Sequence, residues 1–279
     1  MDKVGLLHIA ALCNSSSVVK YLLQQGLDPN AKIDYYKASA MDFAIVSGNL
    51  DNVKILMQKE KIEKSHSKKQ CDAWEFVSAF GSKKAFETLE LLGHQPTKEE
   101  IYNAYLDCSE EQYQYLKTIK NSVHTQVDGE GILLAFSTND MDHHILEICR
   151  EGVKATEHEL KELIWAGEGD IVRKILDNKM TTGKVSKESL LQSAIDIGDY
   201  TMVRYLVKQG ADMNQYVKDE TEDYSWTSFQ EACGSESRDI LRYLKKNGGD
   251  DTKKDSEGRD CKQIAKNNKA VWNLSILVD

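Results

Sequence analysis

The side chains that could do acid–base or metal chemistry are scattered along the chain. His143 and His144 are adjacent, so on a helix they point about 100° apart and make poor joint ligands for one metal ion. The sequence contains no HExxH, GxSxG or GxxxxGKS/T motif. The paired carboxylates Glu99 and Glu100 fit a helix start, where acidic groups interact favourably with the helix dipole. We therefore predict no catalytic residue, no metal site, no cofactor and no enzymatic activity.

The cysteines are also separated from one another. Disulfide and zinc frameworks use clustered spacings, and this sequence has no CxxC pair. Buried free thiols are therefore the favoured interpretation. The six cysteines are Cys13, Cys71, Cys108, Cys149, Cys233 and Cys261.

One long connection, Gln215 to Ser225, interleaves acidic and aromatic side chains. Long loops in an otherwise economical chain are often functional, and this composition suits a basic protein surface, with aromatic anchors and charges that steer. A solvated insertion without a binding role is the alternative. The candidate partner-binding residues here are Tyr216, Asp219, Glu220, Glu222, Asp223, Tyr224 and Trp226.

Two adjacent tyrosines, Tyr35 and Tyr36, stand in a second connection, AKIDYYKAS. Neighbouring side chains on a turn point to different sides, so at least one ring is expected to be exposed. Exposed tyrosines bury much area at little rotamer cost and often anchor a partner. Packing of one ring against the next connection is the other interpretation.

Short amphipathic helices must position these side chains. From Ser189 to Asn214, apolar residues recur at helical spacing in two groups separated by Gly198. Gly210 then supplies the left-handed conformation that ends a helix. Neither helix is long enough to be stable alone, so each apolar stripe must pack on another copy of the unit.

Copies of this unit occur elsewhere in the chain. The segment from Leu6 to Lys32 has the same layout, and another copy surrounds Ala44 and Gly48. These segments resemble the ankyrin repeat, whose unit of about 33 residues is a short turn, two antiparallel helices and a projecting β-turn. The matching motifs are LLHIAA at 6–11, SGNLDNVKIL at 47–56 and GADMN at 210–214.

The resemblance implies an all-α fold, an ankyrin-repeat solenoid of stacked helix-turn-helix units with short β-turn fingers. We expect one array over residues 1–279, without a second domain. In the middle, Thr97 with Glu100 and Thr156 with Glu159 spell capping boxes, so the fingers there should be short or absent. The expected units are 3–33, 37–66, 70–96, 97–125, 128–155, 156–185, 186–222 and 225–253, followed by a C-terminal cap at 255–279, in which Trp272, Leu274 and Ile276 should close the core.

The resemblance also suggests roles for particular residues. His8 falls where the family has a histidine that hydrogen-bonds backbone between repeats, so its expected role is structural. Ankyrin arrays bind partners on the concave face, and the family's variable positions there include Phe80, Trp165 and Asp196 of this sequence. Large aromatic side chains at solvated positions suggest anchors, so Phe80 and Trp165 are candidate partner contacts. Burial beneath a neighbouring loop is the competing interpretation.

The charge balance restricts the class of partner. A net charge of −9 argues against sequence-independent binding to nucleic acid, which needs a basic surface, and favours a protein partner with a basic surface. No apolar run approaches the length of a membrane span, and the first residues lack a signal-peptide pattern. We expect no membrane association, a monomer when free, and a cytoplasmic protein or one exported without a cleaved signal.

The sequence thus predicts a non-enzymatic protein–protein interaction scaffold that binds a partner through its concave face and finger loops. One version of this function is an inhibitor or immunity protein that blocks a toxin or enzyme. The alternative is a secreted ankyrin-type effector that engages host proteins. A catalytic protein with an unrecognised site is the interpretation from a different class.

Overall fold

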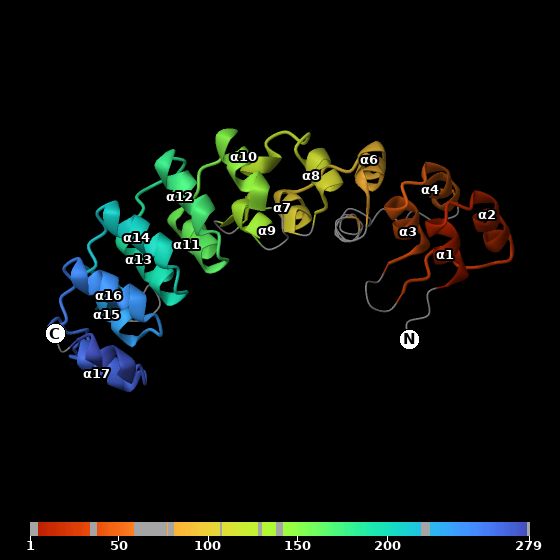
Figure 1. The fold of residues 1–279 in the computed structure, drawn as a ribbon. Helices are drawn as coiled ribbons and strands as arrows, with labels where there is room; N and C mark the ends of the chain where they lie inside the picture. Colours follow the sequence, from red (N-terminus) through yellow and green to blue (C-terminus); the bar gives the residue numbers. More distant parts are fainter. Residues whose placement is uncertain are drawn as a thin grey trace. The chain divides into compact units, whose positions relative to one another are not determined.

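The computed structural model describes residues 5–33, 38–58, 77, 81–106, 108–127, 130–137, 142–218 and 224–277. Its contacts divide the chain into two compact units, Met1–Asn139 and Asp140–Asp279, and each is described by itself. The described residues form helices and two short antiparallel hairpins (Figure 1). The predicted all-α fold of stacked helix-turn-helix units with short β-turn fingers is confirmed.

Unit 1 consists of helix pairs that pack on one another. Helix α1 packs on α2 within a pair and on α3 of the next pair, and α2 packs on α4. Further along, α7 packs on both α8 and α9. The elements are α1 (Leu6–Leu12), α2 (Ser16–Gln24), α3 (Ala40–Val46), α4 (Leu50–Met57), α6 (Lys83–Leu91), α7 (Lys98–Leu106), α8 (Glu110–Leu116), η1 (Ser122–His124), β1 (Gln126–Val127), β2 (Glu130–Gly131) and α9 (Leu133–Ser137).

Unit 2 arranges its helices in two layers (Figure 1). The first helices of successive pairs, α11, α13, α15 and α17, pack side by side in one layer, and α10, α12, α14 and α16 pack in the other. The elements are η2 (Asp142–His144), α10 (Ile145–Arg150), α11 (Glu157–Trp165), α12 (Gly169–Asp177), α13 (Lys187–Asp196), α14 (Tyr200–Lys208), β3 (Tyr216–Lys218), β4 (Ser225–Thr227), α15 (Ser228–Gly234), α16 (Arg238–Lys246), α17 (Cys261–Asn267) and η3 (Val271–Ser275).

The helix starts and turns follow the sequence signals. Thr156 and Glu159 form the predicted capping box of α11, with Glu159 N–H 3.2 Å from the Thr156 hydroxyl oxygen. Gly210 has φ +86°, the left-handed conformation that ends α14, and Asn14 takes φ 57° where other units have glycine. A short hairpin, β1–β2, does project between α8 and α9, in the middle region where fingers were expected to be short or absent.

The packing between pairs depends on small side chains and on backbone hydrogen bonds. Ala11, Ala44 and Ala194 are fully buried, which lets first helices approach closely. His8 Nε2 lies 3.0 Å from the Ala31 carbonyl oxygen in the turn that follows α2, so the structural role expected for this histidine is confirmed.

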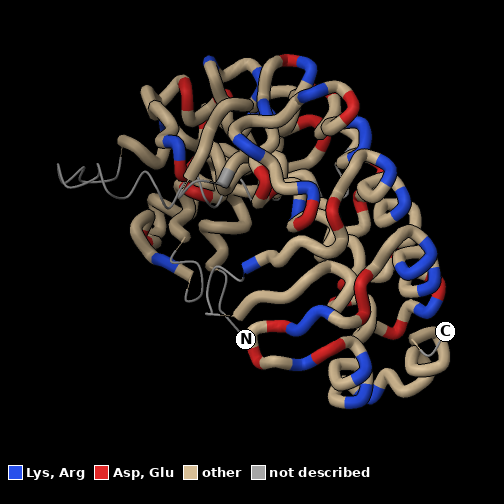
Figure 2. The backbone as a smooth tube through the Cα atoms, turned by 90° about the vertical axis from the view of Figure 1, so that its left-hand side faces the viewer, with Lys and Arg blue, Asp and Glu red and all other residues tan. Residues whose placement is uncertain are grey.

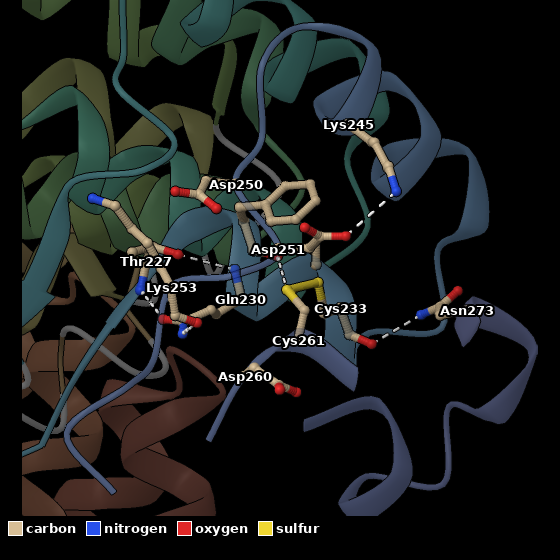
Figure 3. Close-up of a disulfide and its surroundings, with 12 residues drawn as sticks. Thr227, Gln230, Cys233, Lys245, Asp250, Asp251, Lys253, Asp260, Cys261 and Asn273 are labelled. Atoms are coloured by element: carbon tan, nitrogen blue, oxygen red, sulfur yellow. Dashed lines mark hydrogen bonds and ion pairs between the residues drawn. A yellow bond between two sulfur atoms is a disulfide. The ribbon is translucent and has the colours of Figure 1, made fainter. Parts of the chain in front are cut away.

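The cysteine prediction is wrong at one pair. Cys233 of α15 and Cys261 of α17 form a disulfide, with a Cα–Cα distance of 5.4 Å, and both residues are fully buried (Figure 3). The disulfide forms because the first helices of two consecutive pairs pack side by side. The two cysteines are 28 residues apart in the sequence, and that separation gave no sign of a disulfide. Cys13 is a free thiol but exposed, whereas Cys108 and Cys149 are free and buried as expected. Cys71 lies outside the described residues.

The terminal cap also differs from its prediction in one residue. Trp272 is 40% exposed and does not close the core. Ile276 is buried as predicted and Leu274 is half-buried, and Leu277, which was not predicted, is also buried. Asn273 fixes this segment, because its side-chain amide donates to the Cys233 and Ser235 carbonyl oxygens at 3.1 and 2.8 Å (the Cys233 bond is drawn in Figure 3).

Reduction of the Cys233–Cys261 disulfide should destabilise the end of the chain. A cross-link that closes a loop of this length contributes about 3.6 kcal/mol in the chain-entropy description. We expect a reductant to lower the free energy of unfolding by about that amount and to speed amide hydrogen exchange in α17. The variant Cys13→Ser should respond to the reductant as the wild type does, and Cys233→Ala with Cys261→Ala should not respond. An unchanged exchange rate in reduced wild type contradicts this.

Candidate protein-binding site

The predicted binding residues that the structure describes all lie in unit 2. Trp165 ends α11 and Asp196 ends α13, and both are exposed. Tyr216, Tyr224 and Trp226 belong to the β3–β4 hairpin and its approach. The other predicted binding residues lie outside the described residues: Tyr35, Tyr36, Phe80, Asp219, Glu220, Glu222 and Asp223.

The ends of the long connection form a β-hairpin that leads into a helix. Tyr216 pairs with Thr227, Val217 with Trp226, and Lys218 with Ser225. Thr227 is also the N-cap of α15, so β4 continues directly into a first helix. Because neighbouring residues of a strand point to opposite faces, Tyr216 and Trp226 lie on opposite faces of the hairpin.

Tyr216 joins the hairpin to the turn that follows α16. Its hydroxyl donates to the Lys254 carbonyl oxygen at 2.7 Å, and the Lys253 ammonium lies 5.2 Å from the ring centroid. Lys253 also donates to the Asn214 carbonyl oxygen at 2.7 Å. The ring is still 44% exposed, so Tyr216 both fixes the hairpin and offers surface to solvent.

Tyr224 takes part in an ion-pair network on the other face. Its hydroxyl donates to Asp255 Oδ2 at 2.8 Å and accepts from Arg259 Nη2 at 2.6 Å, while Arg259 Nε donates to the same Asp255 oxygen at 2.8 Å. Burial and the Asp255 carboxylate raise the pKa of Tyr224 to about 12. Burial opposes ionisation of Asp255, but hydrogen bonds from Arg259 and Tyr224 hold the pKa of its carboxyl below its usual value.

Trp226 connects this network to a carboxylate on α15. Its ring stacks on Tyr224 with centroids 4.8 Å apart, and its indole N–H donates to Glu231 Oε2 at 2.5 Å. Burial raises the pKa of Glu231, the charge of Asp196 adds to the increase, and the indole hydrogen bond opposes it. Glu231 is therefore a carboxylate whose charged form is disfavoured by its surroundings.

These side chains line a pocket of about 190 Å³. Tyr224 and Trp226 come from the hairpin, Gln230 and Glu231 from α15, and Arg259 from the segment before α17. The sequence prediction missed Glu231 and Arg259. The sequence carried no distinguishing signal for Glu231, because it lies in the first turn of α15, where acidic residues are common.

Among the predicted aromatic anchors that the structure describes, Trp165 is the most exposed. The ring is 45% exposed, and the Lys161 ammonium, one turn earlier in α11, lies 5.6 Å from its centroid. That exposure does not fit burial beneath a neighbouring loop, which was the competing interpretation for this residue.

Charge is distributed unequally between the two helix layers of unit 2 (Figure 2 colours the charged residues by sign). Acidic residues outnumber basic ones in each of α11, α13 and α15, whereas α17 of the same layer carries two lysines and no acidic residue. Basic residues outnumber acidic ones in α14 and α16. We call the surface formed by α11, α13, α15 and the β3–β4 hairpin the first-helix face.

The substitution Glu231→Gln should stabilise the protein at neutral pH. A carboxylate whose folded-state pKa is raised stabilises the fold most below its unfolded-state pKa, and this contribution declines as pH rises through the folded-state pKa. The variant should therefore have the higher unfolding midpoint at pH 7, and the difference should vanish below about pH 4. Urea unfolding at several pH values measures this. A variant less stable than wild type at pH 7 would show that the carboxylate is compensated in the fold.

The contribution of Asp255 to stability should depend on pH in the opposite sense to that of Glu231. A carboxyl with a lowered folded-state pKa stabilises the fold above its unfolded-state pKa of about 3.9, and this contribution is lost as pH falls through the folded-state value. We expect Asp255→Asn to lower the free energy of unfolding at pH 7, and the deficit to shrink towards pH 3. The exposed Glu257→Gln is the control, with a smaller effect. A deficit that is the same at pH 3 and pH 7 contradicts the ionic role.

The comparison with protein-family models agrees with this architecture. A family model described as ankyrin repeats (3 copies) matches residues 2–68 and 160–256, which together make up more than half of the chain. A search of curated proteins finds no match. Among solved structures, the human ASB11 ankyrin repeat domain is 14% identical, with 98% of this chain and 97% of that chain covered and a TM-score of 0.38. On the strength of the family match, the chain belongs to the ankyrin-repeat family.

Proposed function

We propose that this protein is a non-enzymatic interaction scaffold that binds a partner protein on its first-helix face. Ankyrin repeats indicate a protein–protein interaction scaffold, and no motif for catalysis was found in the sequence. The observation that carries the proposal is the concentration of exposed or half-exposed aromatic rings and acidic groups on that face. Trp165, Tyr216 and Trp226 supply aromatic area, and Asp196 and Glu231 supply negative charge.

This surface has the composition expected of a binding site. Aromatic residues dominate interface hot spots, whereas charge complementarity steers association and excludes wrong partners. The hairpin is fixed to the helices by the hydrogen bonds of Tyr216 and Tyr224, so its rings are held in place before a partner arrives.

None of the described helices is both long and apolar enough to span a membrane.

The finer prediction is that binding inhibits the partner, as an immunity protein does. Its support is the acidic character of the first-helix face, which could cover a basic functional surface of a toxin or enzyme. Addition of the protein to the purified partner tests this directly. Loss of the partner's activity at stoichiometric concentration supports inhibition, and full activity in the saturated complex contradicts it.

Substitution of Trp165 should weaken partner binding. Truncation of an aromatic anchor commonly costs about 2 kcal/mol, so we expect Trp165→Ala to lower affinity about thirtyfold. Tyr200→Ala is the matched control, because Tyr200 is also an exposed ring (39%) with a cation one turn away, Arg204, but lies on α14 in the other layer. Proteins captured from extracts of cells that express the protein, quantified by mass spectrometry, provide the measurement.

The expected result is a set of proteins retained by wild type and by Tyr200→Ala but lost with Trp165→Ala. Circular dichroism melting should show that both variants keep their helices. Equal retention by all three proteins would place the binding surface elsewhere. Equal loss of partners with both variants would contradict the proposal that partners bind the first-helix face and not the layer of second helices.

A further inference from the structure

The pocket beside the hairpin contains one charge that the fold leaves without an opposite charge. Glu231 Oε2 accepts the Trp226 indole N–H, and among the described residues no hydrogen bond reaches the second oxygen, Oε1, and no cation pairs with the carboxylate. The nearby acidic group of Asp196 adds repulsion. A positive group that enters the pocket would therefore find a carboxylate oxygen available.

The cation in the pocket wall, Arg259, is already occupied. Its Nε is 2.8 Å from Asp255 Oδ2, its Nη1 is 2.8 Å from Glu257 Oε2, and its Nη2 donates to the Tyr224 hydroxyl. The single positive charge of Arg259 is thus paired with two carboxylates, Asp255 and Glu257. The pocket consequently attracts a cation and does not attract an anion.

The walls of the pocket are held rigidly by hydrogen bonds. Gln230 accepts from the Thr227 backbone N–H at 2.9 Å and donates to the Lys253 carbonyl oxygen at 2.9 Å, a contact that appears in Figure 3. The Trp226 carbonyl oxygen accepts from Gln192 Nε2 at 3.3 Å, which joins the hairpin to α13. A site of this kind loses little entropy when it is filled.

We propose that this pocket receives an arginine side chain of the partner protein, with the guanidinium bound to Glu231 and its stem against Trp226. This inference rests on the proposed function and names the chemistry of the partner. A guanidinium is weakly hydrated, stacks on aromatic rings and donates several hydrogen bonds to a carboxylate, and these properties match the pocket better than those of an ammonium group.

The peptide Ac-Gly-Arg-Gly-NH2 provides the first test, used with the full chain. The indole ¹⁵N–H resonance of Trp226, assigned with Trp226→Phe, reports directly on the hydrogen bond to Glu231. We expect the arginine peptide to shift this resonance saturably at millimolar concentration. The peptide with citrulline, which has nearly the same shape but no charge, should bind at least tenfold more weakly.

Variants separate the pocket from general attraction to an acidic protein. Glu231→Gln should abolish the saturable shift, whereas Glu236→Gln, which removes an exposed carboxylate just after α15, should leave it unchanged. A citrulline peptide that binds as well as arginine, or equal losses in both variants, overturns the proposal. A lysine peptide of equal affinity overturns the assignment to arginine, and no shift at the highest soluble concentration overturns the site.

The two proposals fail in different ways. If the arginine peptide binds through Glu231 but Trp165→Ala retains every captured partner, the pocket is supported and the proposed role of Trp165 as a partner contact is wrong. If partner capture depends on Trp165 but the pocket ignores the arginine peptide, the scaffold function is supported and the present inference is wrong.

Discussion

The structure depends on the packing of each helix pair against the next. The described α-helices have between 5 and 10 residues, which is too short for stability as isolated helices in water. Their apolar sides must therefore be covered by neighbours, and fully buried residues such as Ala11, Ala44 and Leu206 provide that contact. The constraint fixes one side of every helix and leaves the opposite side of the first helices available for other side chains. In unit 2, the exposed Trp165 of α11 and Asp196 of α13 occupy that available side.

The repetitive part of this arrangement could be predicted because its signals are local. Gly198 and Gly210 end helices because their backbone adopts the left-handed conformation. Thr156 caps the start of α11, and Glu159, three residues later, completes the capping box. Such signals lie within one unit, so they can be recognised without knowledge of the neighbours. The role of His8 was predictable for a different reason, because its position in the repeat motif specifies a backbone partner.

The features that were missed all depend on contacts between residues far apart in the sequence. Cys233 and Cys261 meet only because α15 and α17 pack side by side, and Trp272 is exposed because Asn273 and Leu277 occupy the interior of the cap. The pocket has the same origin, since it needs the hairpin, α15, the segment before α17 and α17 itself together. The sequence predicted only a binding role for Tyr216 and Tyr224. In the structure their hydroxyl groups also hold the hairpin in place through hydrogen bonds, which orders the surface that they help to form.

The presence of glutamate and not glutamine at position 231 distinguishes a binding role of this side chain from a purely structural one. If the side chain served only to hold the Trp226 indole, the amide oxygen of a glutamine would accept the same hydrogen bond without a buried charge. A carboxylate at this place costs desolvation and faces the charge of Asp196, so in the free protein it is the less stable choice. The cost is offset when a cation reaches the second oxygen, because the pair then forms in a pocket partly shielded from water. A charge that destabilises the free chain and is compensated only by a ligand is the feature expected of a binding residue. On this ground we infer that the pocket, more than the exposed rings around it, selects the chemistry of a partner.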